Sequence, residues 1–445
     1  MTRLTVLWCW NSEMTGRVAV IGAGPMGLGA AYELARQGMK PVVYEADSVI
    51  GGMAATFDFS GVDIERYYHF YCLSDHDLFE ILRELGIETS LKWANTTMGY
   101  WYRDRVQRWG DPFALLRFRG LNPFSKLRYG IHVLLCTKRK RWLRLDGLDA
   151  KSWIRRRVGG RAFEVLWQNL FEYKFYDQSD NVSAAWIWSR IRRIGLSRET
   201  MFKEKLGYID GGSQTLLDAM AEEIIRLGGS IELNCPVSRV NVISGSVVSV
   251  EVKGQTVPYD SVVSTVPLPY LSRIFPDIQS EYLGLIESKR NIAVVCVVAK
   301  LKRKVTDYFW MNTKDADMDI PGFVEFSNLR PCDDAIVYVP FYLPQEHPTY
   351  AESDEMFKDK VVRYLKKVNP DLMESDFLDF RVSRYQHAQP ICEPGYLASL
   401  PPLDLGVRGV LAADTSYYYP EDRGLSESIG YGRKLARQII AVEAS

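Results

Sequence analysis

Three glycines near the start of the chain have the spacing of a diphosphate-binding turn. Gly22, Gly24 and Gly27 follow the apolar run Val18–Ile21 in the pattern G-x-G-x-x-G. In such a turn the first glycine permits a tight passage from strand to helix, the second lets backbone approach a pyrophosphate, and the third lets the helix lie close to the strand. The helix N-terminus directs unpaired N–H groups toward the phosphates. These residues therefore predict a dinucleotide site.

An acidic residue and a second pair of glycines follow. Glu45 ends the expected strand Pro41–Tyr44, about 20 residues after the third glycine, where a carboxylate accepts hydrogen bonds from a ribose. A carboxylate at this position disfavours the 2′-phosphate of NADP. Gly51 and Gly52 come a few residues later, and a unit that binds only NAD does not need this pair.

Apolar periodicity places these residues among alternating strands and helices. We expect a helix over Ala30–Gln37, a hairpin over Thr56–Ile64 that turns at Ser60-Gly61, and a helix over Asp77–Leu85. Residues 91–204 differ, because Trp, Arg and Phe become frequent and helical periodicity replaces strand alternation.

The later part of the chain returns to the first pattern. Gly211-Gly212 precedes an expected helix over Gln214–Leu227 and a strand over Ser230–Val237. Alternating apolar residues from 270 to about 400 predict an antiparallel sheet with helices on it. A final strand, Gly409–Asp414, precedes the last helix.

Three segments resemble the flavoprotein superfamily that contains monoamine oxidases, protoporphyrinogen oxidase and phytoene desaturases. They are VVYEADSVIGG at 42–52, the glycine–helix–strand unit at 211–237, and the terminal segment at 409–429. The resemblance implies FAD as the cofactor and an α/β fold, in which a Rossmann-like FAD-binding domain accompanies a discontinuous α+β substrate domain with an antiparallel sheet. The residues expected to bind FAD are Gly22, Gly24, Pro25, Met26, Gly27, Glu45, Ala46, Gly51, Gly52, Met53, Val237, Asp414, Glu427, Ser428 and Ile429.

The same resemblance divides the chain into domains. It assigns residues 14–90, 205–269 and 401–445 to the FAD-binding domain, and residues 91–204 and 270–400 to the substrate domain. We expect residues 1–13 to be a dispensable extension, because a start at Met14 would lead almost at once into the first strand.

Tyr68 and His69 are the candidate catalytic residues. In the flavoproteins that this segment resembles, the chain after the glycine pair passes close to the flavin ring, although an isolated histidine is also a common packing or surface residue. The resemblance implies dehydrogenation of a small, partly apolar substrate, such as an isoprenoid or a tetrapyrrole-like molecule, by hydride transfer to flavin N5. Two features argue against a simple primary amine oxidase. Monoamine oxidases and their relatives carry a lysine on a sheet strand, where a water joins it to flavin N5. The strand Ile292–Val298 resembles that strand but has Val294, Val295 and Cys296 instead, and Met53 stands where amine oxidases usually have an arginine.

Two other functions remain open on this fold. Reduced flavin supports isomerisation without net redox in UDP-galactopyranose mutase, and a set of tyrosines and arginines could bind a sugar diphosphate. A non-enzyme resembling the Rab GDP-dissociation inhibitors, which lost the flavin, fits less well because the phosphate-binding glycines are complete. The tyrosines and arginines are Tyr417, Tyr418, Tyr419, Arg423, Arg190, Arg192 and Arg193.

Composition and charge restrict the partners. The chain has 55 Lys and Arg and 55 Asp and Glu, so no global charge indicates a nucleic-acid partner, and we expect a small-molecule substrate. Seven cysteines without a C-x-x-C pair are typical of reduced thiols in a cytoplasmic protein, and five isolated histidines give no support to a metal site. The sequence leaves the oligomeric state open.

Residues 112–145 combine apolar and basic side chains. Such a stretch can lie on an anionic membrane surface. It is more often a helix with one solvated face, which is the interpretation that the sequence favours. No apolar run in it is long enough to span a bilayer.

Overall fold

A parallel sheet lies at the centre of one half of the molecule. The computed structural model describes residues 16–200 and 203–443, so the extension expected at 1–13 lies outside the described residues. The strand order is β10-β2-β1-β14-β20, and every neighbouring pair is parallel. The strands are β1 (Val18–Ile21), β2 (Val42–Tyr44), β10 (Ser230–Glu232), β14 (Ser261–Ser264) and β20 (Val410–Ala412).

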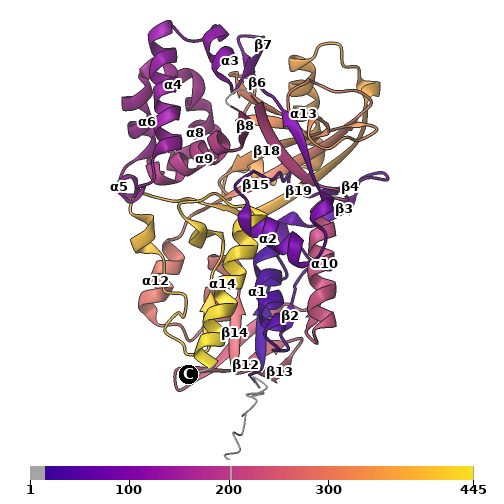
Figure 1. Cartoon of the computed structure of the whole chain (residues 1–445), viewed down its shortest axis with the longest axis vertical. Helices are drawn as coiled ribbons and strands as arrows, with labels where there is room; N and C mark the ends of the chain where they lie inside the picture. The colour runs from indigo at the N-terminus through magenta and orange to yellow at the C-terminus, as the bar shows by residue number, and fades with distance from the viewer. Residues whose placement is uncertain (1–15, 201–202, 444–445) are drawn as a thin grey trace, which may run out of the picture.

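Helices from both ends of the chain cover this sheet. Figure 1 shows the first and the last helix side by side, in indigo and yellow. The sequence predicted the first helix from Ala30, but it begins at Pro25, because the glycine turn itself leads into the first helical turn and proline suits that position. The helices are α1 (Pro25–Arg36), α2 (His76–Glu84), α10 (Ser213–Arg226) and α14 (Leu425–Glu443).

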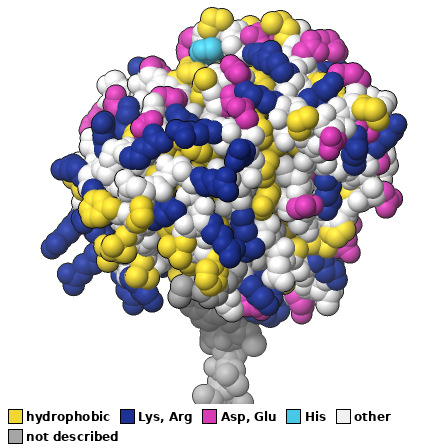
Figure 2. Space-filling view, turned by 90° about the horizontal axis from the view of Figure 1, so that it is seen from above, with side chains coloured by type: hydrophobic (Ala, Val, Ile, Leu, Met, Phe, Trp, Pro, Cys, Tyr) yellow, Lys and Arg dark blue, Asp and Glu magenta, His cyan; other side chains and the backbone are white. Residues whose placement is uncertain are grey.

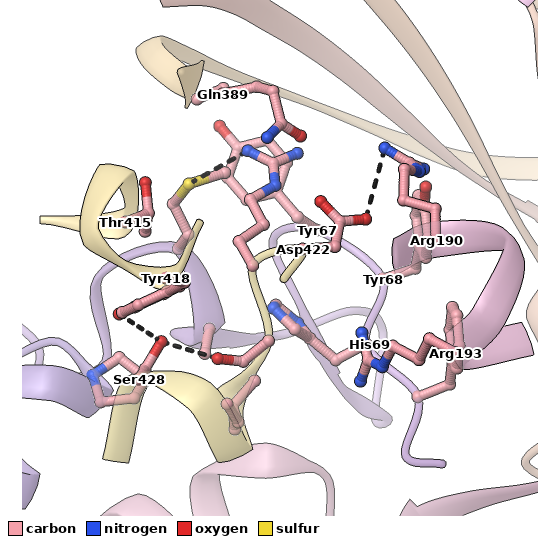
Figure 3. A pocket seen from close by; sticks show the side chains of 18 of the residues that line it. Tyr67, Tyr68, His69, Arg190, Arg193, Gln389, Thr415, Tyr418, Asp422 and Ser428 are labelled. Atoms are coloured by element: carbon pink, nitrogen blue, oxygen red, sulfur yellow. Dashed lines mark hydrogen bonds and ion pairs between the residues drawn. The ribbon is translucent and has the colours of Figure 1, made fainter. Parts of the chain in front are cut away.

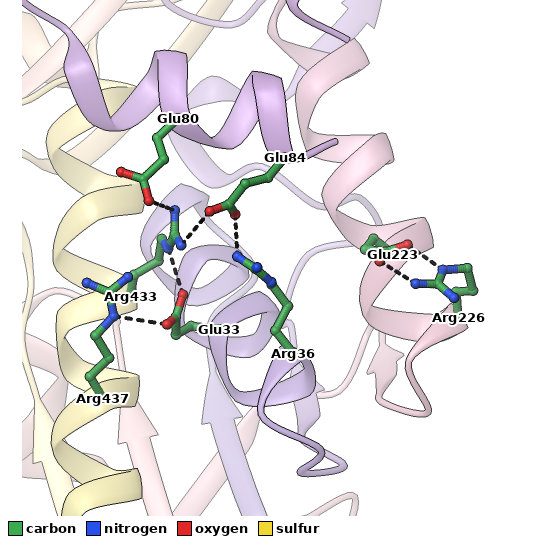
Figure 4. A network of polar contacts seen from close by, with 8 residues as sticks. All are labelled: Glu33, Arg36, Glu80, Glu84, Glu223, Arg226, Arg433 and Arg437. Atoms are coloured by element: carbon green, nitrogen blue, oxygen red, sulfur yellow. Dashed lines mark hydrogen bonds and ion pairs between the residues drawn. The ribbon is translucent and has the colours of Figure 1, made fainter. Parts of the chain in front are cut away.

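A buried ionic network joins three of these helices (Figure 4). Arg433 of α14 is 4% exposed and lies 2.8 Å from Glu33 of α1, 3.2 Å from Glu80 and 3.0 Å from Glu84 of α2. Arg437 contacts the other oxygen of Glu33 at 2.9 Å. The network therefore holds the end of the chain against its beginning.

The predicted strand Ser230–Val237 is in fact two strands. The parallel strand β10 stops at Glu232, and the chain then turns through Asn234, whose φ is +52°. A new strand, β11 (Val237–Ile243), begins after Pro236 in a separate antiparallel sheet with β12 (Ser246–Val252) and β13 (Gln255–Pro258). Because a left-handed residue and a proline cannot continue a ladder, the local sequence breaks the strand.

A seven-stranded sheet dominates the other half, in the order β19-β15-β18-β17-β16-β6-β7. All neighbours are antiparallel except the β16–β6 pair. Helix α13 (Asp354–Val368) packs on this sheet. The α/β class and the antiparallel sheet predicted from the sequence are thus confirmed. The strands are β6 (Met98–Tyr102), β7 (Val106–Trp109), β15 (Asn291–Leu301), β16 (Trp310–Lys314), β17 (Gly322–Glu325), β18 (Ala335–Leu343) and β19 (Phe377–Pro390).

Residues 112–196 form a group of helices that we call the helical arm. Figure 1 draws it at the upper left, beside the antiparallel sheet. Among residues 16–200 and 203–443, no helix is both long and apolar enough to cross a membrane. The arm consists of α3 (Pro112–Arg117), α4 (Pro123–Lys138), α5 (Leu143–Asp146), α6 (Ala150–Val158), α7 (Gly160–Leu166), α8 (Gln168–Phe175) and α9 (Ala184–Leu196).

Smaller elements connect these parts. The predicted hairpin is present and turns at Ser60 and Gly61, which both have positive φ. Its strands are β3 (Thr56–Asp58) and β4 (Asp63–Glu65), and the remaining elements are β5 (Leu91–Thr96), β8 (Arg198–Thr200), β9 (Lys203–Ile209), α11 (Leu271–Ile274) and α12 (Ser280–Ser288).

Candidate active site

One cavity of about 1900 Å³ lies between the parallel sheet, the antiparallel sheet and the helical arm. Its wall contains residues from the start, the middle and the end of the chain, so the three segments singled out in the sequence converge in space. The predicted site residues in the wall are Gly22, Gly24, Pro25, Met26, Glu45, Ala46, Gly52, Met53, Tyr68, His69, Val237, Asp414 and Ser428.

The glycine turn combines close backbone packing with open space. Gly22 has a φ of +99°, and a Cβ on Gly27 would lie 1.8 Å from the carbonyl oxygen of Gly22. Gly24 precedes α1 and has no atom within 4 Å of the position of a Cβ. Gly27 therefore serves the packing of helix on strand, whereas a side chain at Gly24 would project into the cavity.

Glu45 organises the neighbouring loop. Its Oε2 accepts a hydrogen bond from the backbone N–H of Ala23 at 2.7 Å, and its Oε1 accepts one from Asp47 at 2.8 Å. Each carboxylate oxygen retains a further lone pair, which is what a ribose hydroxyl requires. Asp47 forms an ion pair with Arg66 at 2.6 Å, and all three charged side chains line the cavity.

The end of the chain lies across the cavity from the glycine turn and Glu45. We call these three parts together the cradle. Asp414 is 5% exposed and accepts hydrogen bonds from the backbone N–H groups of Leu268 and Ser416, both at 2.8 Å. Burial raises the pKa of Asp414. Ser428, in the first turn of α14, accepts a hydrogen bond from Tyr418 at 2.9 Å and donates one to the carbonyl of Gly424 at 2.7 Å (Figure 3).

Four predicted cofactor residues lie behind the cavity wall. Gly27 and Gly51 shape the turns, and a Cβ on Gly51 would meet Leu217 at 2.8 Å. The carbonyl of Ile429 lies 2.6 Å from the position of a Cβ on Gly29, which places it between α14 and α1. Burial raises the pKa of Glu427 to about 7, against the attraction of Arg193. The sequence expected backbone contacts from Glu427 and Ile429, and these contacts remain predictions.

This end of the cavity fits FAD. The N-termini of α1 and α14 both reach the cavity, through Gly24 to Met26 and through Gly424 and Leu425. Helix N-termini present unpaired N–H groups and a positive partial charge, which suits the diphosphate of a dinucleotide. The open space at Gly24 admits a close approach of phosphate, and Pro236 to Ser238 line the cavity next to Cys235, whose backbone N–H donates a hydrogen bond to the carbonyl of Glu45.

The two candidate catalytic residues lie deeper in the cavity (Figure 3). The Tyr68 hydroxyl lies 3.5 Å from that of Tyr342, and burial together with this neighbour raises the pKa of Tyr68, so the phenol stays protonated. Burial lowers the pKa of His69, against the attraction of Glu65, so its imidazole is neutral at neutral pH. The buried Nδ1 of His69 has no hydrogen-bond partner among the described residues.

A lysine that the sequence reasoning missed also lines the cavity. Lys174 of α8 is 3% exposed, and its Nζ lies 4.7 Å from the centre of the Tyr342 ring. Among the described residues no hydrogen bond or ion pair joins this Nζ to another group. Burial, reinforced by Arg190, lowers the pKa of Lys174 well below its ordinary value. Its spacing from Phe171 and Phe175, both buried, places it on the apolar face of α8 and could have identified it.

The arginines of the predicted sugar-diphosphate site are largely engaged. Arg190 lies 3.3 Å from Asp422, and Arg193 lies 3.1 Å from Asp75. Burial opposes ionisation of Asp422, but Arg190 and the other cations nearby outweigh it and lower its pKa. Both of these arginines and Arg423 line the cavity, and the guanidinium of Arg423 lies 4.0 Å from the sulfur of Met53.

Other members of that predicted set lie elsewhere. Arg192 lies over the Trp188 ring, 5.8 Å from its centre. Tyr419 hydrogen-bonds to Asp146 and Ser183 at 2.5 Å each, and Tyr417 hydrogen-bonds to the carbonyl of Pro401 at 2.9 Å. Of the three tyrosines, only Tyr418 belongs to the cavity wall.

The strand compared with the lysine-bearing strand of the amine oxidases, β15, does not line the cavity. Strand β15 is buried within the sheet, and its Val294, Val295 and Cys296 are at most 2% exposed. The sheet contributes Trp310 and Tyr342 to the cavity instead, from β16 and β18. The absence of a lysine from Ile292–Val298 therefore says nothing about the substrate, because β15 does not reach the cavity. No group of His, Cys, Asp or Glu that could hold a metal occurs in the described part of the chain.

Comparisons with known proteins agree with this geometry. A family model described as flavin-containing amine oxidoreductase matches residues 27–416. The chain is 25% identical over 327 residues to 15-cis-phytoene desaturase of Synechococcus elongatus, which covers 65% of this chain and 66% of that protein. The alignment thus spans just under two thirds of that relative.

Solved structures share the fold. A putative protoporphyrinogen oxidase from Exiguobacterium superposes with a TM-score of 0.76 at 18% identity, over 96% of this chain and 99% of the other. A reduced UDP-galactopyranose mutase superposes with a TM-score of 0.73 at 15% identity, over 96% of each chain. At these identities the likeness concerns the fold alone.

Proposed function

Because the chain belongs to the family of flavin-containing amine oxidoreductases, whose cofactor is FAD, we propose that it is an FAD-dependent dehydrogenase acting on an elongated, mainly apolar substrate. The reaction removes a hydride from one carbon of the substrate and a proton from its neighbour, and so introduces a double bond.

The size and the apolar lining of the cavity support this proposal. Its volume of about 1900 Å³ exceeds the roughly 300–1000 Å³ of ordinary ligand pockets, which leaves room for a second molecule beside FAD. Beyond the cradle the wall is mainly aromatic and aliphatic, from Phe309, Trp310 and Tyr342 to Leu115 and Val133 in the arm. A long apolar molecule would fit this path better than a compact polar one.

The residues around the far end of the cradle have distinct roles in the proposed reaction. FAD supplies the hydride acceptor when it is bound. Burial lowers the pKa of Lys174 and so favours its neutral amine, whose lone pair can accept the substrate proton. Tyr68 and the aromatic rings around it exclude water and position the substrate.

The name of one relative supports the same substrate class. The match to a 15-cis-phytoene desaturase suggests an unsaturated hydrocarbon, and Met53, which lines the cavity where amine oxidases usually carry an arginine, argues against a simple amine. The isomerase alternative is weakened because Arg190 and Arg193 are already paired with carboxylates.

Anaerobic bleaching of the bound flavin tests the proposal. We would mix FAD-loaded protein with a linear polyene precursor in detergent micelles, with primary and secondary amines, and with a nucleotide sugar. Bleaching by the polyene alone is the expected result. Bleaching only by amines would overturn the substrate class, and conversion of the nucleotide sugar only after dithionite reduction would favour the isomerase.

A further inference from the structure

One face of the helical arm exposes its apolar side chains. We call this the α4 face, and it comprises Leu116, Phe124, Leu127, Ile131, Leu134 and Leu135, which are 48–66% exposed. Half of the exposed large hydrophobic side chains in the described residues lie between 113 and 148, a small part of the chain. Figure 2 shows hydrophobic side chains gathered at the left, the side on which Figure 1 draws α4.

Helix α4 is inverted relative to an ordinary surface helix. Its buried side chains are Ser125, His132 and Cys136, whereas Phe124 and Leu127 face solvent. A surface helix of a globular protein normally turns its apolar stripe to the core. A contiguous exposed apolar stripe indicates an interaction surface.

The charge around the α4 face indicates what it contacts. Residues 112–145 contain nine Lys and Arg and no Asp or Glu, although the whole chain is neutral. None of these nine forms an ion pair with a carboxylate in the described residues. Basic side chains that surround an apolar stripe match an anionic lipid surface, where the stripe enters the acyl boundary and the cations meet headgroups. The nine are Arg117, Arg119, Lys126, Arg128, Lys138, Arg139, Lys140, Arg141 and Arg144.

The active-site cavity reaches this same face. Gly130, Val133, Thr137 and Lys138 of α4 belong to the cavity wall, and so does Leu134, which is also 57% exposed. Leu196, at the end of α9, likewise lines the cavity and is 41% exposed. The cavity that begins at the glycine turn therefore ends beside the exposed apolar stripe.

We infer that the α4 face docks on an anionic lipid bilayer, with the mouth of the cavity turned toward the lipid. An apolar substrate then passes from the bilayer into the cavity without crossing water. The docking stands independently of the proposed function, whereas the route of the substrate rests on it.

Vesicle sedimentation tests the docking. FAD-loaded, full-length protein should sediment with vesicles of phosphatidylcholine and phosphatidylglycerol, but not with phosphatidylcholine alone, and salt should weaken the binding. The double variant Phe124→Glu/Leu127→Glu should lower the affinity at least tenfold. Neither residue lines the cavity, so FAD content and melting temperature should stay at the wild-type level. Ile243→Glu is the matched control, because Ile243 is 64% exposed on the sheet of β11.

Three results would overturn the docking. They are failure of the wild type to bind anionic vesicles, equal binding by the double variant, and a wild-type dimer in solution that the double variant converts to monomer, which would mean that a second copy covers the face. The route of the substrate has its own test. The double variant should lose flavin reduction by substrate dissolved in vesicles and keep it in detergent micelles. If no apolar substrate reduces even the wild type, the proposed function fails while the vesicle result still decides the docking.

Discussion

The two halves of the molecule bury a cation in opposite ways. Arg433, among the helices that cover the parallel sheet, contacts three carboxylates. Lys174, in the arm, contacts aromatic rings, and no described residue forms an ion pair with it. A buried charge that is fully paired holds helices together, whereas a buried amine without an ionic partner loses its proton more readily and becomes available for chemistry.

The same contrast extends to apolar surface. Helices α1 and α14 bury their apolar faces against each other and the sheet, whereas α4 exposes its own. The helices around the parallel sheet therefore contribute mainly to stability. The arm provides the surfaces for the proposed contacts with substrate and lipid. The predictions below test this difference, beginning with the largest expected effect.

Gly24→Val should abolish the flavin. The branched side chain would project into the open space at the cradle, so the purified protein should be colourless yet folded. Flavin absorbance and melting temperature measure the two properties. Gly284→Val is the control, since Gly284 also has open space around it but lies outside the cavity wall. If Gly24→Val retains flavin at the wild-type level, the glycine turn does not bind the diphosphate of FAD as proposed.

Arg433→Met should lower the free energy of unfolding by about 3–5 kcal/mol, because it removes the buried cation that three carboxylates share and leaves the buried Glu33 with Arg437 alone. Denaturant titration measures the change. Arg226→Met is the matched control, since Arg226 is exposed and its pair with Glu223 contributes little to stability. Equal effects of the two variants would contradict the conclusion that the ion pairs of Arg433 hold the helices together.

Lys174→Met should raise the stability of the protein, whereas Arg433→Met lowers it. Flavin reduction by substrate should slow about 100-fold through loss of the proton acceptor, while the protein becomes more stable because a buried amine is gone. Lys289→Met is the control, because Lys289 is also buried but pairs with Glu393 outside the cavity. Wild-type reduction rates in Lys174→Met would exclude Lys174 from the chemistry.

The pH dependence of stability should reveal the same amine. The folded pKa of Lys174 is lowered, so between that pKa and the ordinary value of about 10.4 the unfolded chain binds more protons. The contribution of Lys174 to stability is therefore most unfavourable below the folded pKa and recovers as pH rises from the folded pKa to the ordinary value. Subtracting the unfolding curves of Lys174→Met from those of the wild type should show this rise, and a flat difference would contradict it.

His69→Ala should have the smallest effect, about a tenfold slower flavin reduction, equivalent to about 1.4 kcal/mol, with little change in FAD affinity. Rapid-mixing spectroscopy and flavin titration separate the two. His76→Ala is the control, because His76 is exposed on α2. If His69→Ala weakens FAD binding and leaves reduction intact, His69 supports the cofactor.

Several site features could be predicted because they depend on a few neighbouring residues. The glycine spacing requires a particular backbone path, and Glu45 follows at the end of the next strand, so both could be identified without tertiary information. The break between β10 and β11 was also encoded locally, in Asn234 and Pro236, but the apolar alternation around them concealed it.

Other features could not be predicted because they depend on distant contacts. Which strands face the cavity depends on the covering helices, and so the sequence could not show that β15 lies away from the cavity. The role of the basic and apolar residues at 112–145 was equally undecided, since only their exposure distinguishes a docking face from a packed helix. The domain boundaries stay predictions.

The amino-acid sequence by itself determined the cofactor cradle, because glycines, a strand-end acid and two helix starts act through local backbone geometry. Only the tertiary structure decided that Lys174 lies without an ionic partner in the cavity and that the cavity ends at the α4 face. Burial and the identity of neighbours determine a pKa or an exposed surface, and these arise only when segments far apart in the chain pack together.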